Sequence, residues 1–193
     1  MAQNWEFGAA AGYGVYHDAT ISTGAGSAQA GMENDIAASA VVCEDRFDHF
    51  SGEMRYLYQS GHPFLSQSGT KAEMNGESHA FVYDGLFHFR KRESSWRPYV
   101  ALGIGIKGYI GGPTPAAQPL SKEAGLTATD QWLVVGSAGA GIKFKLQRHV
   151  VLRFDVRDYI SPVPKKQIHP APGASVSAVL QQITPMAGIS YMF

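Results

Sequence analysis

The sequence has few charged residues, a single cysteine and no excess of either charge. Asp, Glu, Lys and Arg make up 17% of the 193 residues, whereas soluble domains typically have roughly 25%. The formal net charge is zero, so no basic surplus favours nucleic acid as a partner. Because Cys43 is alone, an internal disulfide and a metal site built from several cysteines are excluded.

A membrane-spanning helix and a leader are also missing. No run of about 18 or more apolar residues occurs. The start, MAQNWEF, lacks the basic and apolar regions of a signal peptide. Taken alone, these absences favour a cytoplasmic protein. A mature export product that carries an initiator methionine would begin in the same way, so the remaining pattern has to decide.

What the sequence has instead is alternation of apolar and polar residues over most of its length. In HVVLRFDVRDY, for example, Leu152 and Phe154 fall on one face, and Arg153 and Asp155 fall on the other. A period of two is typical of β-strands that bury or expose one apolar face. The alternation predicts eight strands, at 4–17, 35–46, 50–60, 76–90, 96–109, 129–146, 149–160 and 175–193.

The connections between these strands alternate between short and long. Outer-membrane barrels have short periplasmic turns and longer extracellular loops. We therefore predict an all-β fold, a single domain over 1–193: an eight-stranded antiparallel up-and-down transmembrane β-barrel with both ends on the periplasmic side. The tight connections are 47–49, 91–95 and 147–148, and the long ones, rich in Gly, Pro and Ser, are 18–34, 61–75, 110–128 and 161–174.

A soluble barrel with an apolar interior is the alternative, and the glycines and aromatic residues argue against it. An eight-stranded interior is only just wide enough for its own side chains, so glycines opposite long charged residues suit a polar lumen. Aromatic rings near strand ends suit the girdles at two membrane interfaces. The glycines are Gly8, Gly12, Gly14, Gly103, Gly105, Gly139 and Gly141, and the rings include Trp5, Tyr13, Phe50, Tyr58, Trp96, Trp132 and Tyr191.

Strand parity assigns many charged residues to this lumen. Buried charges have to be paired, which favours a salt-bridged plug. Because the bases outnumber the acids, a narrow path for small solutes or anions is the alternative. The assigned residues are Glu6, Glu53, Arg55, Asp84, His88, Arg90, Lys107, Lys143, Lys145, Arg153, Asp155 and Arg157.

Three stretches resemble the small eight-stranded outer-membrane barrels of the OmpA, OmpX and OmpW group. They are RPYVALGIGIKGY, GSAGAGIKFKLQRHVVLRFDVRDY and the terminal GISYMF. The resemblance implies an outer-membrane protein of a Gram-negative cell envelope, whose leader has been removed and which contacts outer-membrane lipid and lipopolysaccharide. It also implies that the barrel-insertion machinery reads Tyr191 and Phe193. Members of the group act as anchors, adhesins, channels or lipid-modifying enzymes, so the fold leaves the activity open.

No catalytic motif supports the enzyme alternative. The sequence contains neither G-x-S-x-G nor H-E-x-x-H, so we expect no catalytic residue, no metal and no cofactor. His17, His62, His79 and His169 fall near the extracellular side without the spacing of metal ligands. Cys43 is expected to be a small packing residue.

The proline-rich connections are the most informative candidates for function. GGPTPAAQPL and SPVPKKQIHPAPG contain seven prolines between them, and proline lowers the entropy lost when a loop becomes ordered. They predict either a protective cover or a preformed surface for an extracellular partner. The leading interpretation is a structural or surface-interaction protein with a mostly plugged lumen.

Overall fold

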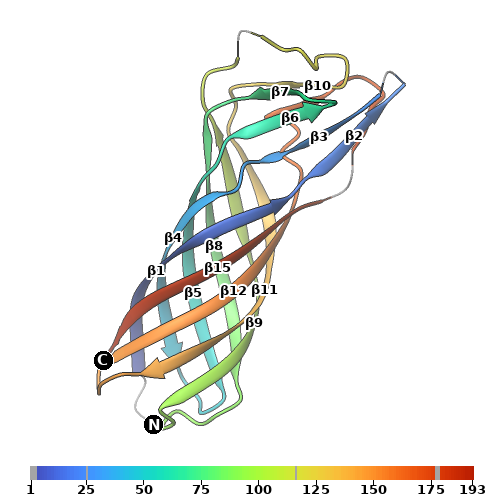
Figure 1. The fold of residues 1–193 in the computed structure, drawn as a ribbon. Coiled ribbons are helices and arrows are strands. Elements are labelled where there is room, and N and C mark those ends of the chain that lie inside the picture. The colour runs from blue at the N-terminus through green and yellow to red at the C-terminus, as the bar shows by residue number, and fades with distance from the viewer. Residues whose placement is uncertain (1–3, 25, 116, 177–178) are drawn as a thin grey trace.

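A closed barrel of antiparallel strands forms the body of the molecule (Figure 1). The computed structural model describes residues 4–24, 26–115, 117–176 and 179–193. Around the barrel the order is β1-β15-β12-β11-β9-β8-β5-β4, so strands adjacent in the chain pair and β1 closes on β15. The barrel strands are β1 (Asn4–His17), β4 (Asp35–Asp45), β5 (Phe50–Ser60), β8 (Gly76–His88), β9 (Trp96–Gly111), β11 (Gln131–Lys145), β12 (Val150–Pro162) and β15 (Val179–Met192).

These eight strands confirm the predicted fold, with ends that differ by a few residues. The largest difference concerns the last strand, which was predicted from residue 175. Ser175–Val176 instead form a separate short strand, residues 177 and 178 lie outside the described residues, and β15 begins at Val179. In the part of the chain that the structure describes, no helix is long and apolar enough to cross a membrane.

Along the barrel strands most large apolar side chains point outward and most charged ones point inward. In β12, Phe154 is 44% exposed while its neighbours Arg153 and Asp155 are buried. Leu102 and Ile104 of β9 are likewise exposed, at 73% and 66%. A soluble barrel needs the opposite arrangement, so the apolar-core alternative is wrong.

The two ends of the barrel differ. At one end, which we call the turn end, short connections join β4 to β5, β8 to β9 and β11 to β12, and β1 begins where β15 ends (Figure 1). The closure there includes the amide of Phe193, which donates to the carbonyl of Trp5 over 2.9 Å. All the long connections lie at the opposite end.

The long connections were expected to be loops, and that expectation is wrong because they contain further strands. Five of these strands form a sheet in the order β14-β2-β3-β6-β7, and two others pair as β10 and β13. We call the described residues of 18–34, 61–75, 112–130 and 163–176 the crown. Its strands are β2 (Ala19–Thr23), β3 (Gly26–Met32), β6 (Pro63–Gln67), β7 (Thr70–Glu73), β10 (Ala124–Leu126), β13 (Ile168–Pro170) and β14 (Ser175–Val176).

The crown has a hydrophobic core of its own, above the barrel. Its buried side chains come from four separate stretches of the chain, so they hold the long connections together. Burial of apolar surface stabilises such a cluster without any help from the membrane. The core consists of Ile21, Ala30, Leu65, Ala72, Met74, Leu120, Ala124, Leu126 and Ile168.

Candidate functional site

The centre of the lumen is an ion-pair cluster around Glu53. Its carboxylate accepts from Arg55 at 2.9 Å, from Arg153 at 2.6 Å and from Arg157 at 3.1 Å. Glu53 lies on β5, whereas Arg153 and Arg157 lie on β12, so the cluster bridges opposite walls of the barrel. All four side chains are buried.

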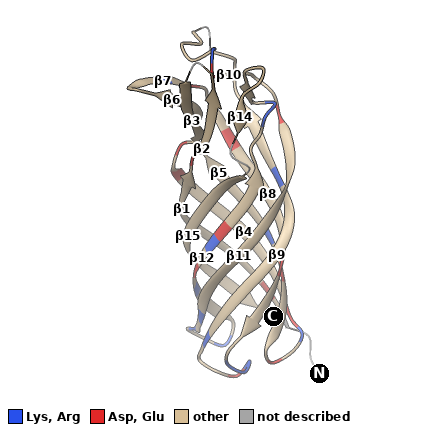
Figure 2. Cartoon of the chain, turned by 90° about the vertical axis from the view of Figure 1, so that its right-hand side faces the viewer, with Lys and Arg blue, Asp and Glu red and all other residues tan. Residues whose placement is uncertain are grey.

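The cluster continues toward the turn end through Glu6 and across the lumen through Asp155. Glu6 accepts from Lys143 at 2.6 Å and from Arg153 at 3.2 Å. Asp155 accepts from Arg55 at 2.9 Å. Acidic and basic positions lie next to each other at mid-height of the barrel in Figure 2. The shared arginines join these carboxylates into one network, which we call the plug.

Asp84 adds a further carboxylate to the plug, 3.0 Å from Nη1 of Arg157. Glycines make room for these long side chains. A Cβ atom on Gly139 would come within 2.6 Å of Cδ of Arg157, and one on Gly141 would come within 2.6 Å of the Tyr99 ring. The lumen at this height is therefore packed with side chains.

Several lumen residues were missed from the sequence, among them Tyr99, Arg97 and Asp45. Tyr99 donates to Asp155 over 2.9 Å, and Arg97 donates to Asp45 over 2.7 Å near the turn end. Arg97 and Tyr99 are an even number of positions from Lys107 in β9, so they point to the same face of the strand. Asp45 is related to Cys43 in β4 in the same way. Continuing the alternation to the ends of these two strands would have identified all three.

Lys107 lies in the lumen nearer the crown and is 1% exposed. Its Nζ donates to Tyr16 over 2.8 Å and to Gln182. The rings of Tyr16 and Tyr109 lie 4.6 and 5.0 Å from the same atom. Among the described residues no carboxylate pairs with Lys107, so aromatic faces and neutral acceptors surround its ammonium group.

Arg90 and Lys145 do not join the plug, although both were assigned to the lumen. β8 ends at His88, so strand parity no longer governs Arg90, which is exposed with its guanidinium 3.7 Å from the Trp96 ring centroid. Lys145 is half-buried at the end of β11 and donates to the carbonyl of Arg92. Their assignment to the buried network is wrong because each lies at or beyond the end of its strand.

His88 faces the lumen beside Ser51 and Asp45. The Ser51 hydroxyl lies 2.8 Å from Nε2 of His88 and also donates to Asp45. A hydrolytic triad needs the carboxylate on the other imidazole nitrogen, where it orients the ring. Here Nδ1 of His88 has no hydrogen-bond partner among the residues that the structure describes. The three side chains therefore have the composition of a triad without its geometry, and all are buried.

The histidines expected near the extracellular side form no metal site among the described residues. No group of three or more His, Cys, Asp and Glu side chains within the described ranges could hold a metal ion. His62 lies 3.6 Å from Glu33 in the crown. His79 instead lies on the outer wall of the barrel, beside Tyr56 and Glu77.

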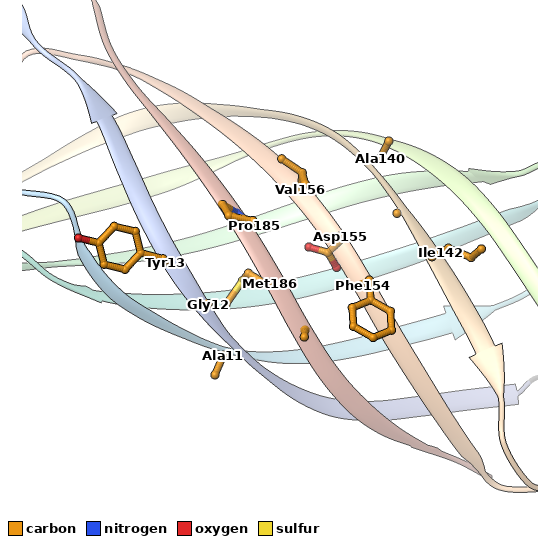
Figure 3. A pocket seen from close by; sticks show the side chains of 12 residues that line it. Ala11, Gly12, Tyr13, Ala140, Ile142, Phe154, Asp155, Val156, Pro185 and Met186 are labelled. Atoms are coloured by element: carbon orange, nitrogen blue, oxygen red, sulfur yellow. The ribbon is translucent and has the colours of Figure 1, made fainter.

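The outer wall carries a groove of about 750 Å³ across β1, β15, β12 and β11 (Figure 3). Pro185 has no N–H, and the β1–β15 pairing is interrupted there, between Gly12↔Met186 and Val15↔Ile183. Asp155 borders the groove, but Arg55 and Tyr99 hold its carboxylate in the plug. The groove is thus part of the apolar wall. Its lining is Ala11, Gly12, Tyr13, Ala140, Gly141, Ile142, Phe154, Asp155, Val156, Pro185, Met186 and Ala187.

The crown presents a mixed-charge surface. Lys71 pairs with Glu33 and, at 2.9 Å, with Glu73. These hydrogen bonds raise the pKa of Lys71, and the bond to Lys71 lowers the pKa of Glu73. Because the pairs are exposed, they contribute little to stability. A cleft of about 450 Å³ next to them is lined by Tyr16, Asp18, Met32, Glu33, Asn34, Phe64, Ser66 and Lys71.

No family model and no curated protein matches the chain. Solved structures do match over nearly the whole length. Neisserial surface protein A is 12% identical, with a TM-score of 0.59 and 100% of both chains covered. The outer membrane protein OprG from Pseudomonas aeruginosa is 13% identical, with a TM-score of 0.61 over 97% of this chain and 95% of that one.

The N-terminal β-barrel domain of Pseudomonas aeruginosa OprF is also similar. It is 13% identical, with a TM-score of 0.53, and the match covers 98% of this chain and 97% of that one. Identities this low carry the fold and not the activity. The chain has the fold of the small eight-stranded outer-membrane barrels, as its sequence predicts.

Proposed function

We propose that this chain, a barrel of the small eight-stranded outer-membrane type, is an integral outer-membrane protein with a structural or surface-interaction role. In this proposal the crown is the extracellular interaction surface, and the plug closes the lumen. The observation that carries the proposal is the combination of an ion-paired plug with a crown that has its own hydrophobic core.

The apolar outer wall supports the membrane location. Leu102, Ile104 and Val134 form part of a wide belt of exposed apolar side chains. A soluble monomer rarely exposes an apolar patch of more than a few hundred Å². Lipid accepts such a surface, and the closed sheet leaves no unpaired strand edge in it.

The plug argues against a wide pore. An eight-stranded barrel has room only for its own side chains, and here arginines from β5 and β12 meet over Glu53. Opening a path would separate buried ion pairs and leave charges uncompensated, which is costly. A narrow anion path is the second candidate, because Lys107 is a buried base without a carboxylate partner among the described residues.

The crown is suited to recognition because it is ordered before it binds. A preformed surface loses less conformational entropy on binding than a flexible loop does. Its exposed ion pairs and the cleft beside Phe64 offer charged, polar and aromatic contacts. An extracellular partner and the lipopolysaccharide of the same membrane are the proposed partners, and the proposal includes no catalytic step.

The test is cysteine labelling in intact cells with a membrane-impermeant maleimide. The native Cys43 is buried and provides the unlabelled background. Thr70→Cys, on the crown, is expected to label in intact cells. Leu102→Cys, in the apolar belt, is expected to label only after the membrane is dissolved and the protein unfolded. Ready labelling of Leu102→Cys in intact cells would refute the membrane placement.

A further inference from the structure

A connected group of polar side chains lies on the outer wall, at the crown end of the apolar belt. Tyr56 and Tyr58 of β5 lie beside His79 and Glu77 of β8. The Tyr56 hydroxyl is 2.8 Å from Nδ1 of His79, whose Nε2 is 3.2 Å from Oε1 of Glu77. The ring of Tyr58 packs against the same imidazole, with ring centroids 5.5 Å apart. The hydrogen bonds form one chain of donors and acceptors that faces away from the lumen.

An apolar pocket of about 510 Å³ lies directly against this group. The indole of Trp132 extends across β9 at Gly108, where a Cβ atom would come within 2.7 Å of the ring. The absence of a side chain at Gly108 therefore lets Trp132 reach Phe81, with ring centroids 6.4 Å apart. The lining is Tyr56, His79, Phe81, Ile110 and Trp132.

A second, more polar pocket of about 310 Å³ continues the first toward the crown, and Ile110 borders both. Its lining includes Tyr58, Ser60, His62, Asn75 and Glu77. The two pockets together change from apolar to polar along the direction in which a membrane changes from hydrocarbon to headgroup. Among the described lining residues of both pockets there is no Lys or Arg.

We propose that the two pockets bind a glycolipid of the outer leaflet, a lipid whose headgroup is uncharged and rich in hydroxyls. An acyl chain lies in the lower pocket against Phe81 and Trp132. Sugar hydroxyls donate to Glu77 and pair with Tyr58 in the upper pocket. A phosphate headgroup fits less well, because it would meet the Glu77 carboxylate with no lysine or arginine in the lining to offset the repulsion. This inference rests on the proposed membrane location.

The test uses the full chain with Trp5→Phe and Trp96→Phe, which leaves Trp132 as its only tryptophan. The protein is reconstituted in phosphatidylcholine vesicles that contain a minor fraction of one lipid with brominated chains. That lipid is a galactosyl diacylglycerol, a phosphatidylglycerol or phosphatidylcholine itself. Quenching of Trp132 by bromine then reports which lipid occupies the pocket.

We expect the galactolipid to associate about fivefold more strongly than phosphatidylcholine, which is the effect of about one net hydrogen bond. Tyr58→Phe and Glu77→Ala should each reduce this preference toward one. Tyr13→Phe is the matched control, since Tyr13 is an exposed tyrosine outside both pockets, and it should leave the preference unchanged.

Three results would overturn the proposal in distinguishable ways. Equal quenching by the galactolipid and phosphatidylcholine would remove the site while leaving the barrel in the membrane. A stronger preference for phosphatidylglycerol would refute the uncharged headgroup. Failure of every brominated lipid to quench Trp132 would refute the membrane placement itself.

Discussion

Glu53 lies at the centre of the plug. Three arginines reach its carboxylate, and two of them also contact Asp155 within 3.6 Å. Each charge in such a cluster is expensive to bury alone and acceptable only because its partners are present. The stability of the plug should therefore respond strongly to the loss of this one negative charge.

We predict that Glu53→Gln lowers the free energy of unfolding by about 3 to 5 kcal/mol, because it leaves buried guanidinium groups without their counter-charge. Urea unfolding of the refolded barrel in detergent micelles measures this. Glu73→Gln is the matched control, since its partner Lys71 is exposed, and its effect should stay within about 1 kcal/mol. Equal effects of the two substitutions would contradict the plug.

At the scale of single elements, β15 has two tasks that can be separated. Along its length it pairs with both β1 and β12 and so closes the barrel. Phe193, which follows the end of β15, contributes less to the finished sheet. Phe193 is 68% exposed, and its ring contacts are with Phe7 and Tyr191, at centroid distances of 5.7 and 4.9 Å.

We propose that the terminal residue is a recognition signal for insertion, so deletion of Phe193 is expected to reduce the amount of barrel inserted in cells. The free energy of unfolding of the refolded protein should change by no more than about 2 kcal/mol, the value of one partly buried ring. Cell fractionation and micelle unfolding measure the two effects. Phe50→Ala removes another exposed aromatic ring and should leave insertion intact; unchanged insertion of the deletion would disprove the signal.

The elements of the barrel could be predicted because one face of each strand is uniformly apolar, as in β12 and β11. The strands of the crown could not, because they are short and rich in small residues that give no strong alternation. One local signal was present. Ser68 and Gly69, between β6 and β7, both have positive φ, at 47° and 85°, and a Ser-Gly pair between alternating residues favours a tight hairpin.

The alternation along each strand also predicted which residues face the lumen. It did not predict which of these residues contact one another. Arg157 and Glu53 are separated by 104 positions in the sequence, and their contact depends on the tilt and stagger of the closed sheet. The surplus of bases seen in the sequence is reduced because Arg90 is exposed and Lys145 is only half-buried at the end of β11, so neither joins the plug. The group around His79 could not be predicted from the sequence, because Tyr56 and Glu77 lie on different strands.

At the scale of the whole molecule, the barrel and the crown have different environments and different cores. The barrel is polar inside and apolar outside, whereas the crown buries Leu65, Leu126 and Ile168 as an ordinary protein does. This division underlies our proposal that the barrel anchors the molecule and the crown recognises a partner. The proposed division of roles requires a closed lumen, because an open lumen would make transport the simpler function.

Single-channel recording in a planar bilayer under a salt gradient tests this closure most directly. The account predicts no stable conductance from the refolded protein, and any residual leak should favour anions because Lys107 is a buried base without a carboxylate partner among the described residues. Glu53→Gln, with the plug weakened, should increase the frequency of brief openings. Large, stable, cation-selective openings of the unmodified protein would contradict both the closed plug and the assignment of the crown as the functional surface.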